Sequence, residues 1–394
     1  MVAELGPLPS PAAEGLARST ALGTRIREAI DDGGGAIDFA RYMEMALYTP
    51  GLGYYSGAGS PFGSAGDFIT APEISALFGQ CLAAYLAPVL GHLGDADVLE
   101  FGPGSGALAV AVLNTLATLD RVPRRYRMLE LSGTLAAAQR TTLEALDGPL
   151  RERVEWLDRL PATGLRGCFI ANEVADAIPF RRLRIGRETV QEWRVAWQDG
   201  GPAWALGPLR DDGLAAAVAR LRPFLAADSL PYDTEVAPAR RAWLASAAAT
   251  LREGAMVVLD YGFERRELCR AGRHGGTMAC HYRHHTHDDP LILPGLQDIT
   301  SHVDFTDLAE AAVDAGLDVA GFTTQAQFLL GQGLLERAAA AGADLSLAAL
   351  ARSGEIKRLT LPGEMGEVFK VLALGRQLPP GLLTFPGRDM RARL

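Results

Sequence analysis

Hydrophobic residues in the middle and end of the chain form short apolar runs separated by longer segments with helical spacing. The runs have the length of β-strands, and several of the intervening segments carry apolar residues three or four positions apart. This alternation is typical of a parallel sheet whose strands are joined by helices. We predict seven strands, at residues 98–101, 126–131, 153–157, 168–172, 256–260, 318–323 and 367–373.

The residues before and between these strands follow other patterns. Phe39, Met43 and Leu47 recur at helical spacing, and residues 74–86 predict an amphipathic helix. Three short apolar runs within residues 183–206 are separated by glycine turns, which predicts an antiparallel ribbon.

Together these patterns predict an α/β fold with additions to a central sheet. The insertion at 265–300 has little periodicity, which is typical of a lid or a binding element. We expect a helical N-terminal extension with a cofactor-site lid loop at 1–95, a Rossmann-like core at 96–375 with insertions at about 180–250 and 265–300, and a C-terminal tail at 376–394.

A glycine-rich turn follows the first predicted strand. Residues 98–106 read VLEFGPGSG, so that Glu100, Gly102, Gly104 and Gly106 separate the strand from the next helix. Glycines let the backbone approach a ligand closely, because a Cβ would collide with it. The same glycines also fit the relaxed sequence pattern of dinucleotide-binding sites. A third interpretation is that the glycine loop binds no ligand and only lets the helix pack on the sheet.

Glu100 distinguishes between the candidate cofactors. A dinucleotide places its pyrophosphate at the helix N-terminus, close to where this carboxylate would stand. S-adenosyl-L-methionine (SAM) instead brings an ammonium and a sulfonium group, which a carboxylate attracts. The sequence therefore predicts SAM as the cofactor, with a nicotinamide dinucleotide as the alternative.

Acids after the second and third strands are candidates for the nucleoside half of the cofactor. Glu130 ends the second strand and could accept hydrogen bonds from both ribose hydroxyls. Asp120 is closer to the usual spacing from the glycines, but its surroundings predict a loop, so Glu130 is preferred. Asp158, just past the third strand, could meet the adenine amino group or be a plain surface acid.

A polar segment at 66–73 is a candidate lid over the amino-acid end of the cofactor. Asp67 or Thr70 could reach the cofactor from this segment. From the residues alone, however, Thr70 is better explained as the cap of the helix that begins at Pro72.

The turn after the fourth strand carries the candidates for catalysis. Its sequence at 172–179 is NEVADAIP, and the carboxyl ends of parallel strands face the cofactor in this fold class. Glu173 and Asp176 could hold a guanidinium acceptor through charge-assisted hydrogen bonds, next to Asn172. We predict that these two acids orient the acceptor; acids that suit the dipole of a helix N-terminus are the alternative.

Composition and charge limit the classes of partner and compartment. The net charge of −9 argues against nucleic acid as a partner, and we expect neither a signal peptide nor a membrane span. The four cysteines show no C-x-x-C spacing, which fits a reducing compartment. Histidines gather at 281–287 without the spacing of a standard metal signature, so we expect no metal.

Seven motifs together resemble the MidA-type SAM-dependent methyltransferases, which include mitochondrial arginine methyltransferases of complex I assembly. They extend over nearly the whole chain, about residues 36–375, and those before the glycine loop and after Gly262 are far more specific than the glycine loop itself. They read ALYTPGLGYY at 46–55, GDFITAPEI at 66–74, LEFGPGSG at 99–106, ANEVADAIP at 171–179, DYG at 260–262, LQDITSHVDF at 296–305 and MGEVFK at 365–370.

The resemblance implies a class I methyltransferase core that methylates an arginine of a protein, for the mitochondrial relatives a complex I subunit. It implies that Asp67 and His302 face the active site, where Asp260 and Tyr261 already belong as the residues after the fifth strand. A non-catalytic SAM-binding assembly factor is the alternative. The implied compartment is the bacterial cytoplasm, or the mitochondrial matrix for a eukaryotic chain. Val174–Ala175 depart from the bulkier residues common in the family, which affects the identity of the substrate.

Overall fold

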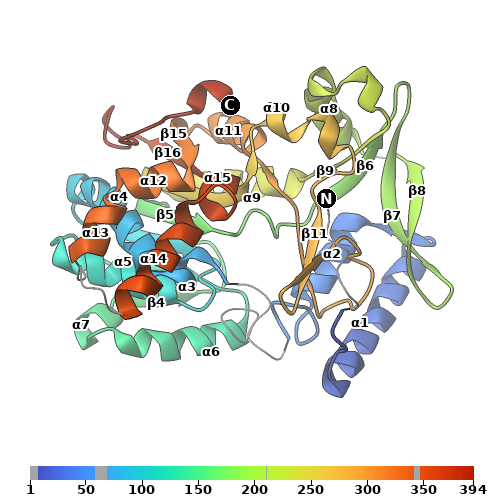
Figure 1. Cartoon of the computed structure of the whole chain (residues 1–394). Helices are drawn as coiled ribbons and strands as arrows, with labels where there is room; N and C mark the ends of the chain where they lie inside the picture. The colour runs from blue at the N-terminus through green and yellow to red at the C-terminus, as the bar shows by residue number, and fades with distance from the viewer. Residues whose placement is uncertain (1–7, 58–68, 210, 341–346) are drawn as a thin grey trace. The chain divides into compact units, whose positions relative to one another are not determined.

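The computed structural model describes residues 8–57, 69–209, 211–340 and 347–394 (Figure 1). By their contacts they form two compact units, each assembled from separate chain segments. Unit 1 comprises Met1–Phe68, Asp176–Ala242 and Glu264–Asp304, and unit 2 comprises Ile69–Ala175, Trp243–Phe263 and Phe305–Leu394. The inserted segments thus fold with the N-terminal residues, whereas the segment that begins at Ile69 folds with the central sheet.

Seven strands among the described residues of unit 2 form its sheet, in the order β15-β16-β10-β5-β2-β3-β4. Strands β10, β5, β2, β3 and β4 run parallel, and β16 runs antiparallel to both of its neighbours. This confirms the predicted Rossmann-like fold. The bounds are β2 Asp97–Phe101, β3 Tyr126–Leu129, β4 Val154–Leu157, β5 Leu165–Asn172, β10 Leu251–Phe263, β15 Asp318–Thr324 and β16 Phe369–Arg376.

Helices connect these strands and cover the sheet. Within unit 2 they are α3 Ala71–Ile74, α4 Ala76–Leu93, α5 Ala107–Thr118, α6 Gly133–Thr142, α7 Gly148–Arg151, α11 Phe305–Asp314, α12 Gln325–Gly331, α13 Leu334–Ala340, α14 Leu347–Thr360 and α15 Met365–Val368. Helix α9, Pro238–Thr250, starts in unit 1 and ends in unit 2.

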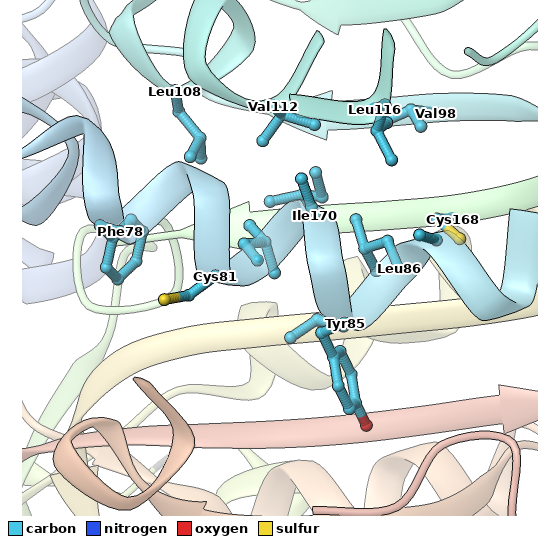
Figure 2. Close-up of a cluster of buried hydrophobic side chains, with 14 of the residues drawn as sticks. Phe78, Cys81, Tyr85, Leu86, Val98, Leu108, Val112, Leu116, Cys168 and Ile170 are labelled. Atoms are coloured by element: carbon cyan, nitrogen blue, oxygen red, sulfur yellow. The ribbon is translucent and has the colours of Figure 1, made fainter. Parts of the chain in front are cut away.

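Helix α4 lies in the core of unit 2, where it contacts α5 and strands β5 and β10 of the sheet (Figure 2). Phe78, Cys81 and Leu86 are fully buried, with Val112 of α5 and Ile170 of β5 in the same cluster. Burying a leucine or phenylalanine side chain contributes about 1.5–3 kcal/mol. A helix was predicted at 74–86, but its description as amphipathic was wrong, since α4 is buried on most of its circumference.

Two further features of α4 depart from the sequence prediction. The helix begins only at Ala76, because Ser75 separates it from the short α3 and its hydroxyl accepts a hydrogen bond from the Leu77 amide at 3.3 Å. Helix α4 is also long and apolar enough to cross a membrane by length and composition, but 67% of it is buried inside the protein. Its apolar character is thus explained by its place in the core.

Unit 1 contains two antiparallel sheets among its described residues. One joins β1-β7-β6-β9 with β8 paired to β7, which confirms the predicted ribbon, and the other has the order β12-β11-β13. The bounds are β1 Ala36–Asp38, β6 Arg181–Ile185, β7 Val190–Gln198, β8 Gly201–Pro208, β9 Tyr232–Val236, β11 Ala279–Tyr282, β12 His285–His287 and β13 Asp298–Thr300, with helices α1 Ala13–Asp32, α2 Phe39–Tyr48, α8 Asp212–Leu221 and α10 Arg265–Leu268. The two-residue β14, Val303–Asp304, belongs to neither of these sheets.

The four cysteines are free and buried, two in each unit. Cys81 and Cys168 lie in the core of unit 2, and Cys269 and Cys280 lie in cores of unit 1. Burial raises the pKa of the Cys81 and Cys269 thiols to about 12. All four act as small hydrophobic residues in this structure.

Candidate cofactor and acceptor site

The glycine loop between β2 and α5 depends on left-handed backbone at three positions. Gly102, Gly104 and Gly106 have φ values of 55°, 58° and 85°. A side chain at these angles costs conformational energy, and a Cβ on Gly102 would approach Val174 Cγ2 at 3.3 Å. The loop therefore exposes backbone instead of side chains at the start of α5, as the sequence predicts for a ligand-binding turn.

Glu100 lies on β2 just before this loop, but its side chain is only 2% exposed. Its neighbours along the strand alternate in direction, so that Glu100 shares the face of Val98, which packs in the core beneath α4 and α5. The Tyr126 hydroxyl donates a hydrogen bond to its Oε2 atom at 2.7 Å. Sequence reasoning placed a charged acid here and did not foresee its burial.

The surroundings of Glu100 change its charge. The pKa of Glu100 is raised to about 8. Burial is the main cause, the hydrogen bond from Tyr126 lowers the pKa in part, and the nearby Glu130 raises it. At neutral pH the carboxyl group is therefore mostly protonated when no cation is near. A bound cation would favour its ionised form.

Glu130 directly follows β3 at the carboxyl edge of the sheet. It is partly buried, and its carboxylate accepts hydrogen bonds from the Ser132 amide at 2.7 Å and from the Gln139 side chain at 2.9 Å. Burial raises its pKa, and these two hydrogen bonds lower it again in part. The adjacent Leu131 is 75% exposed, so an apolar surface stands beside this acid.

Asp120, the alternative to Glu130, lies in the turn that precedes β3. It is therefore near the amino end of the strand, whereas Glu130 follows the carboxyl end. The geometry supports the preference for Glu130.

Gln139 of α6 is a residue that the sequence analysis missed. It is fully buried, although glutamines are mostly exposed, and its side chain also donates to the Gly104 carbonyl at 3.0 Å. Its oxygen accepts a hydrogen bond from the indole of Trp156 on β4 at 2.9 Å. A lone glutamine within a helix gives no signal in a single sequence, because nothing marks which face it occupies.

The turn after β5 holds Asn172 and Glu173. Glu173 has a left-handed backbone with φ 53°, and its amide donates to the Leu259 carbonyl of β10 at 2.9 Å. Its Oε1 atom accepts hydrogen bonds from the Ala71 amide at 3.4 Å and from the Asn172 side chain at 3.3 Å. The carboxylate is thus tied both to its own strand end and to the start of α3.

Asp260 of β10 supports the same turn from below. It is fully buried, and its two carboxylate oxygens accept hydrogen bonds from the Ala175 and Tyr261 amides, both at 2.9 Å. The sequence analysis placed Asp260 among the substrate-binding residues. In the structure it holds backbone, so that its substrate-binding role stays a prediction, and the partly buried Tyr261 packs edge to face against Phe369 with ring centroids 5.4 Å apart.

Three other expected cofactor residues are placed less distinctly. Asp67 lies outside the described residues. Thr70 occupies the N-cap position of α3, as the helix-cap interpretation requires, but its hydroxyl makes no capping hydrogen bond. Asp158 follows β4 with its side chain 89% exposed and 3.9 Å from the Arg159 guanidinium, as expected for a surface acid.

Asp176 and His302 belong to unit 1, where the buried Arg240 links the chain segments that carry them. Its guanidinium donates to the Asp176 carbonyl at 3.2 Å and to the His302 carbonyl at 3.3 Å. The Ser301 amide also donates to the Asp176 carbonyl at 3.2 Å. The structure therefore brings the two predicted segments together, although they are more than 100 residues apart in the sequence.

Two tyrosines of unit 1 adjoin this group and were not predicted as site residues. The Tyr48 hydroxyl donates to the carbonyl of Ala177, next to Asp176, at 2.9 Å. The Tyr55 hydroxyl donates to Asp298 Oδ1 at 2.9 Å, and the two rings stack with centroids 5.6 Å apart. The repeated tyrosines of the motif at 46–55 were the available signal.

The histidine-rich segment forms the hairpin of β11 and β12. Arg283 and His284 make its two-residue turn with left-handed backbone, and His281 is hydrogen-bonded to Thr286. Within the described ranges, no group of three or more histidine, cysteine, aspartate or glutamate side chains is placed to hold a metal ion.

Comparisons with known proteins bear on this arrangement. Residues 81–323 match Methyltransf_28, a family of S-adenosyl-L-methionine-dependent methyltransferases. A COG1565 superfamily member from Burkholderia thailandensis, solved with S-adenosyl-homocysteine bound, is 40% identical with a TM-score of 0.92, covering 98% of this chain and 100% of that one. A second structure of a COG1565 protein from the same organism is 40% identical with a TM-score of 0.90 and the same coverage.

More distant relatives carry named activities. The mitochondrial protein arginine methyltransferase NDUFAF7 of Mus musculus is 28% identical over 86% of this chain and 81% of its own length. The mitochondrial NDUFAF7 homolog of Drosophila melanogaster is 28% identical over 86% of this chain and 82% of its own. The nicotinamide alternative is thereby overturned, since the matched family uses SAM and the similar structure binds its demethylated product. With its sheet order, glycine loop and matched residues, the chain belongs to the Methyltransf_28 family of SAM-dependent methyltransferases.

Proposed function

We propose that this methyltransferase methylates a guanidinium nitrogen of an arginine in a protein. The observation that carries the proposal is the left-handed Glu173, whose carboxylate is held by the Ala71 amide and Asn172. Such backbone is uncommon outside glycine and is maintained only when its surroundings enforce it, often at functional sites. A carboxylate fixed in this way suits a guanidinium, which binds carboxylates through charge-assisted, often bidentate hydrogen bonds.

The relatives that bear arginine methyltransferase names support this choice of acceptor. They align over most of this chain at 28% identity, which is compatible with a shared acceptor and does not fix it.

The cofactor would lie along the carboxyl edge of the sheet. Gly102, Gly104 and Gly106 leave room for it at the start of α5, and Glu130 is the candidate for its ribose hydroxyls. Glu100 would ionise next to the cationic amino-acid end, where the charge of the ligand lowers its pKa. Thr70, Asp67 and Asp158 remain predictions for the edges of the site.

Bound SAM supplies an electrophilic methyl group on a positively charged sulfur. In the in-line displacement a nitrogen–carbon bond forms while the sulfur–carbon bond breaks, and the electron pair of that bond stays on sulfur. Glu173 and Asp176 would orient the guanidinium so that one nitrogen lone pair faces the methyl group, and would accept the proton that this nitrogen loses. Positioning and exclusion of water therefore account for most of the expected rate enhancement.

The Glu173→Gln variant tests the proposal. We expect it to bind S-adenosyl-homocysteine within about twofold of wild type in calorimetry, because the glycine loop and Glu130 are unchanged. Its methyl transfer to protein substrates in a cell extract should fall by at least about 100-fold, since an amide cannot pair with a guanidinium as a carboxylate does. Transfer is followed with radiolabelled SAM, and the methylated residue is identified by mass spectrometry.

The matched control is Glu253→Gln, which changes an acid of unit 2 near the amino end of β10, where it forms an ion pair with Arg166 of β5. It should leave transfer unchanged. Unchanged transfer in Glu173→Gln, or a methyl mark on a residue other than arginine, would refute the proposal. If wild type binds the cofactor yet transfers no methyl group to any protein, a non-catalytic assembly factor is the better interpretation.

The protein substrate remains a prediction from the sequence resemblance, namely a respiratory complex I subunit. The corresponding compartment is the bacterial cytoplasm or the mitochondrial matrix. Mass spectrometry of the proteome with and without this protein would identify the arginine whose methylation is lost.

A further inference from the structure

Gln139 connects the loops that follow two neighbouring strands, and it reaches a third strand as well. Its Nε2 atom donates to the Gly104 carbonyl at 3.0 Å and to Glu130 Oε2 at 2.9 Å. Its Oε1 atom accepts from Trp156 Nε1 at 2.9 Å. A side chain with no exposed surface thereby touches the glycine loop after β2, the acid after β3 and the middle of β4.

The orientation of this amide is determined by its partners. A carbonyl and a carboxylate can only accept hydrogen bonds, and an indole N–H can only donate one. Exchange of the amide nitrogen and oxygen of Gln139 would therefore break all three contacts. Both donors of the amide group and one acceptor position of its oxygen are used, so the group is fully satisfied in a site without solvent.

We propose that Gln139 is a positioning residue that couples the glycine loop to Glu130, so that the two halves of the cofactor site are held in one geometry. The inference rests on the proposed placement of SAM along these two elements. Gln139 need not touch the cofactor, because it acts by fixing the rotamer of Glu130 and the direction of the Gly104 carbonyl. The Trp156 indole holds the amide oxygen of Gln139 through its hydrogen bond, and the Arg140 guanidinium lies 4.4 Å from the centroid of the Trp156 ring.

Loss of Gln139 has a specific consequence. A leucine of similar volume removes the hydrogen-bond partner of the Gly104 carbonyl and of the Trp156 indole, and it leaves Glu130 Oε2 without the side chain that fixes its position beside the Ser132 amide contact of Oε1. Glu130 then no longer presents both oxygens to the ribose. Affinity for ligands with a ribose should fall, beyond any general effect on folding.

The experiment measures the affinity for S-adenosyl-homocysteine by calorimetry in Gln139→Leu, Trp156→Phe and Glu130→Gln. We expect Gln139→Leu to weaken binding about 10- to 100-fold, since buried groups lose their hydrogen bonds. Trp156→Phe keeps an aromatic ring at this position and removes the indole donor, so a loss of about 3- to 10-fold is expected. This second variant keeps the test available if Gln139→Leu does not fold.

Gln325→Leu is the matched control. Gln325 is also buried in unit 2, at 1% exposure, and its amide donates to the Leu359 carbonyl at 3.0 Å. Its replacement should lower thermal stability to a similar extent and change the affinity by less than about twofold. Equal losses of affinity in Gln139→Leu and Gln325→Leu would reduce Gln139 to a structural residue and overturn the inference.

A double-mutant cycle between Gln139 and Glu130 tests the coupling itself. If Gln139 acts through Glu130, the combined variant loses less affinity than the product of the two single losses. Losses that simply multiply would overturn the coupling. Unchanged binding in Glu130→Gln would instead show that the proposed placement of the cofactor is wrong, which is a different failure.

The pH profile of adenosine binding adds a readout that a folding defect would not move. The hydrogen bond from Gln139 lowers the pKa of Glu130, so its removal should shift the acidic limb of the profile to higher pH. Glu100 on β2 is the titratable group that faces Glu130, and Tyr126 is bonded to Glu100. Adenosine lacks the ammonium group that would engage Glu100, which keeps the two titrations apart. If the acidic limb of the pH profile lies at the same pH in Gln139→Leu as in wild type, the inference is contradicted.

Discussion

The carboxyl edge of the sheet positions its acids in two different ways. On the cofactor side, Glu100 is buried and Glu130 is partly buried, and burial raises the pKa of both carboxyl groups. In the turn after β5, Glu173 has a left-handed φ, and its carboxylate accepts hydrogen bonds from the Ala71 amide and the Asn172 side chain. Burial thus controls the protonation of the two acids in the first region, whereas the backbone conformation controls the direction of the Glu173 carboxylate in the second.

The largest expected effect on stability comes from replacing Asp260, which holds the backbone of the turn after β5. Asp260→Ala removes the fully buried carboxylate that accepts hydrogen bonds from the Ala175 and Tyr261 amides, so we expect the free energy of unfolding to fall by about 2–4 kcal/mol. Urea denaturation measures this. Asp260→Asn keeps one carbonyl oxygen and should lose about half as much; if both variants are as stable as wild type, Asp260 does not hold the turn.

A smaller effect is expected from Glu100→Gln, through the dependence of stability on pH. Because the pKa of Glu100 is about 8 in the folded state, above its ordinary value of 4.5, the folded state retains a proton that the unfolded state loses. The stability contributed by this group is full below pH 4.5 and is lost as the pH rises through about 8.

The variant should therefore lose less stability than wild type between pH 5 and pH 8, by about 1–3 kcal/mol in ligand-free protein. Thermal denaturation at both pH values gives the difference. Saturating SAM should reduce it, because the cation favours the ionised carboxylate. Identical pH dependence in the two proteins would show that burial does not control the charge of Glu100.

The smallest expected effect on stability, with a large effect on activity, comes from Glu173→Gly. Glycine adopts a φ of 53° without strain, so the stability should change by less than about 1 kcal/mol in either direction. Methyl transfer should nevertheless be lost with the carboxylate. A loss of stability as large as that in Asp260→Ala would remove the distinction between the two ways of holding an acid.

The sequence predicted the sheet of unit 2 well and much of unit 1 less well. Apolar runs such as that of β5 are buried on both faces, so they stand out from their surroundings. Strands β11, β12 and β13 are only three or four residues long and include His281 and Asp298, so no periodicity marks them. The assembly of unit 1 from three distant segments depends on long-range pairing such as that of β1 with β7.

The candidate site shows the same limit at the level of side chains. The glycine loop, Glu130 and Glu173 were identifiable because strand order fixes which turns share an edge. The burial of Glu100 depends on Tyr126, and the role of Asp260 depends on Ala175, partners that lie 26 and 85 residues away. Gln139 could not be found for the same reason, since its three partners come from the loops after β2 and β3 and from β4.

The distribution of the cysteines offers a practical probe of the two units. Cys81 and Cys168 report on unit 2, while Cys269 and Cys280 report on unit 1, and none reacts readily while it is buried with a raised pKa. Alkylation timed in native buffer, followed by peptide mass mapping, would register the opening of each unit separately. Cysteine alkylation in the wild-type chain can therefore show, without an added label, whether a ligand stabilises one unit or both.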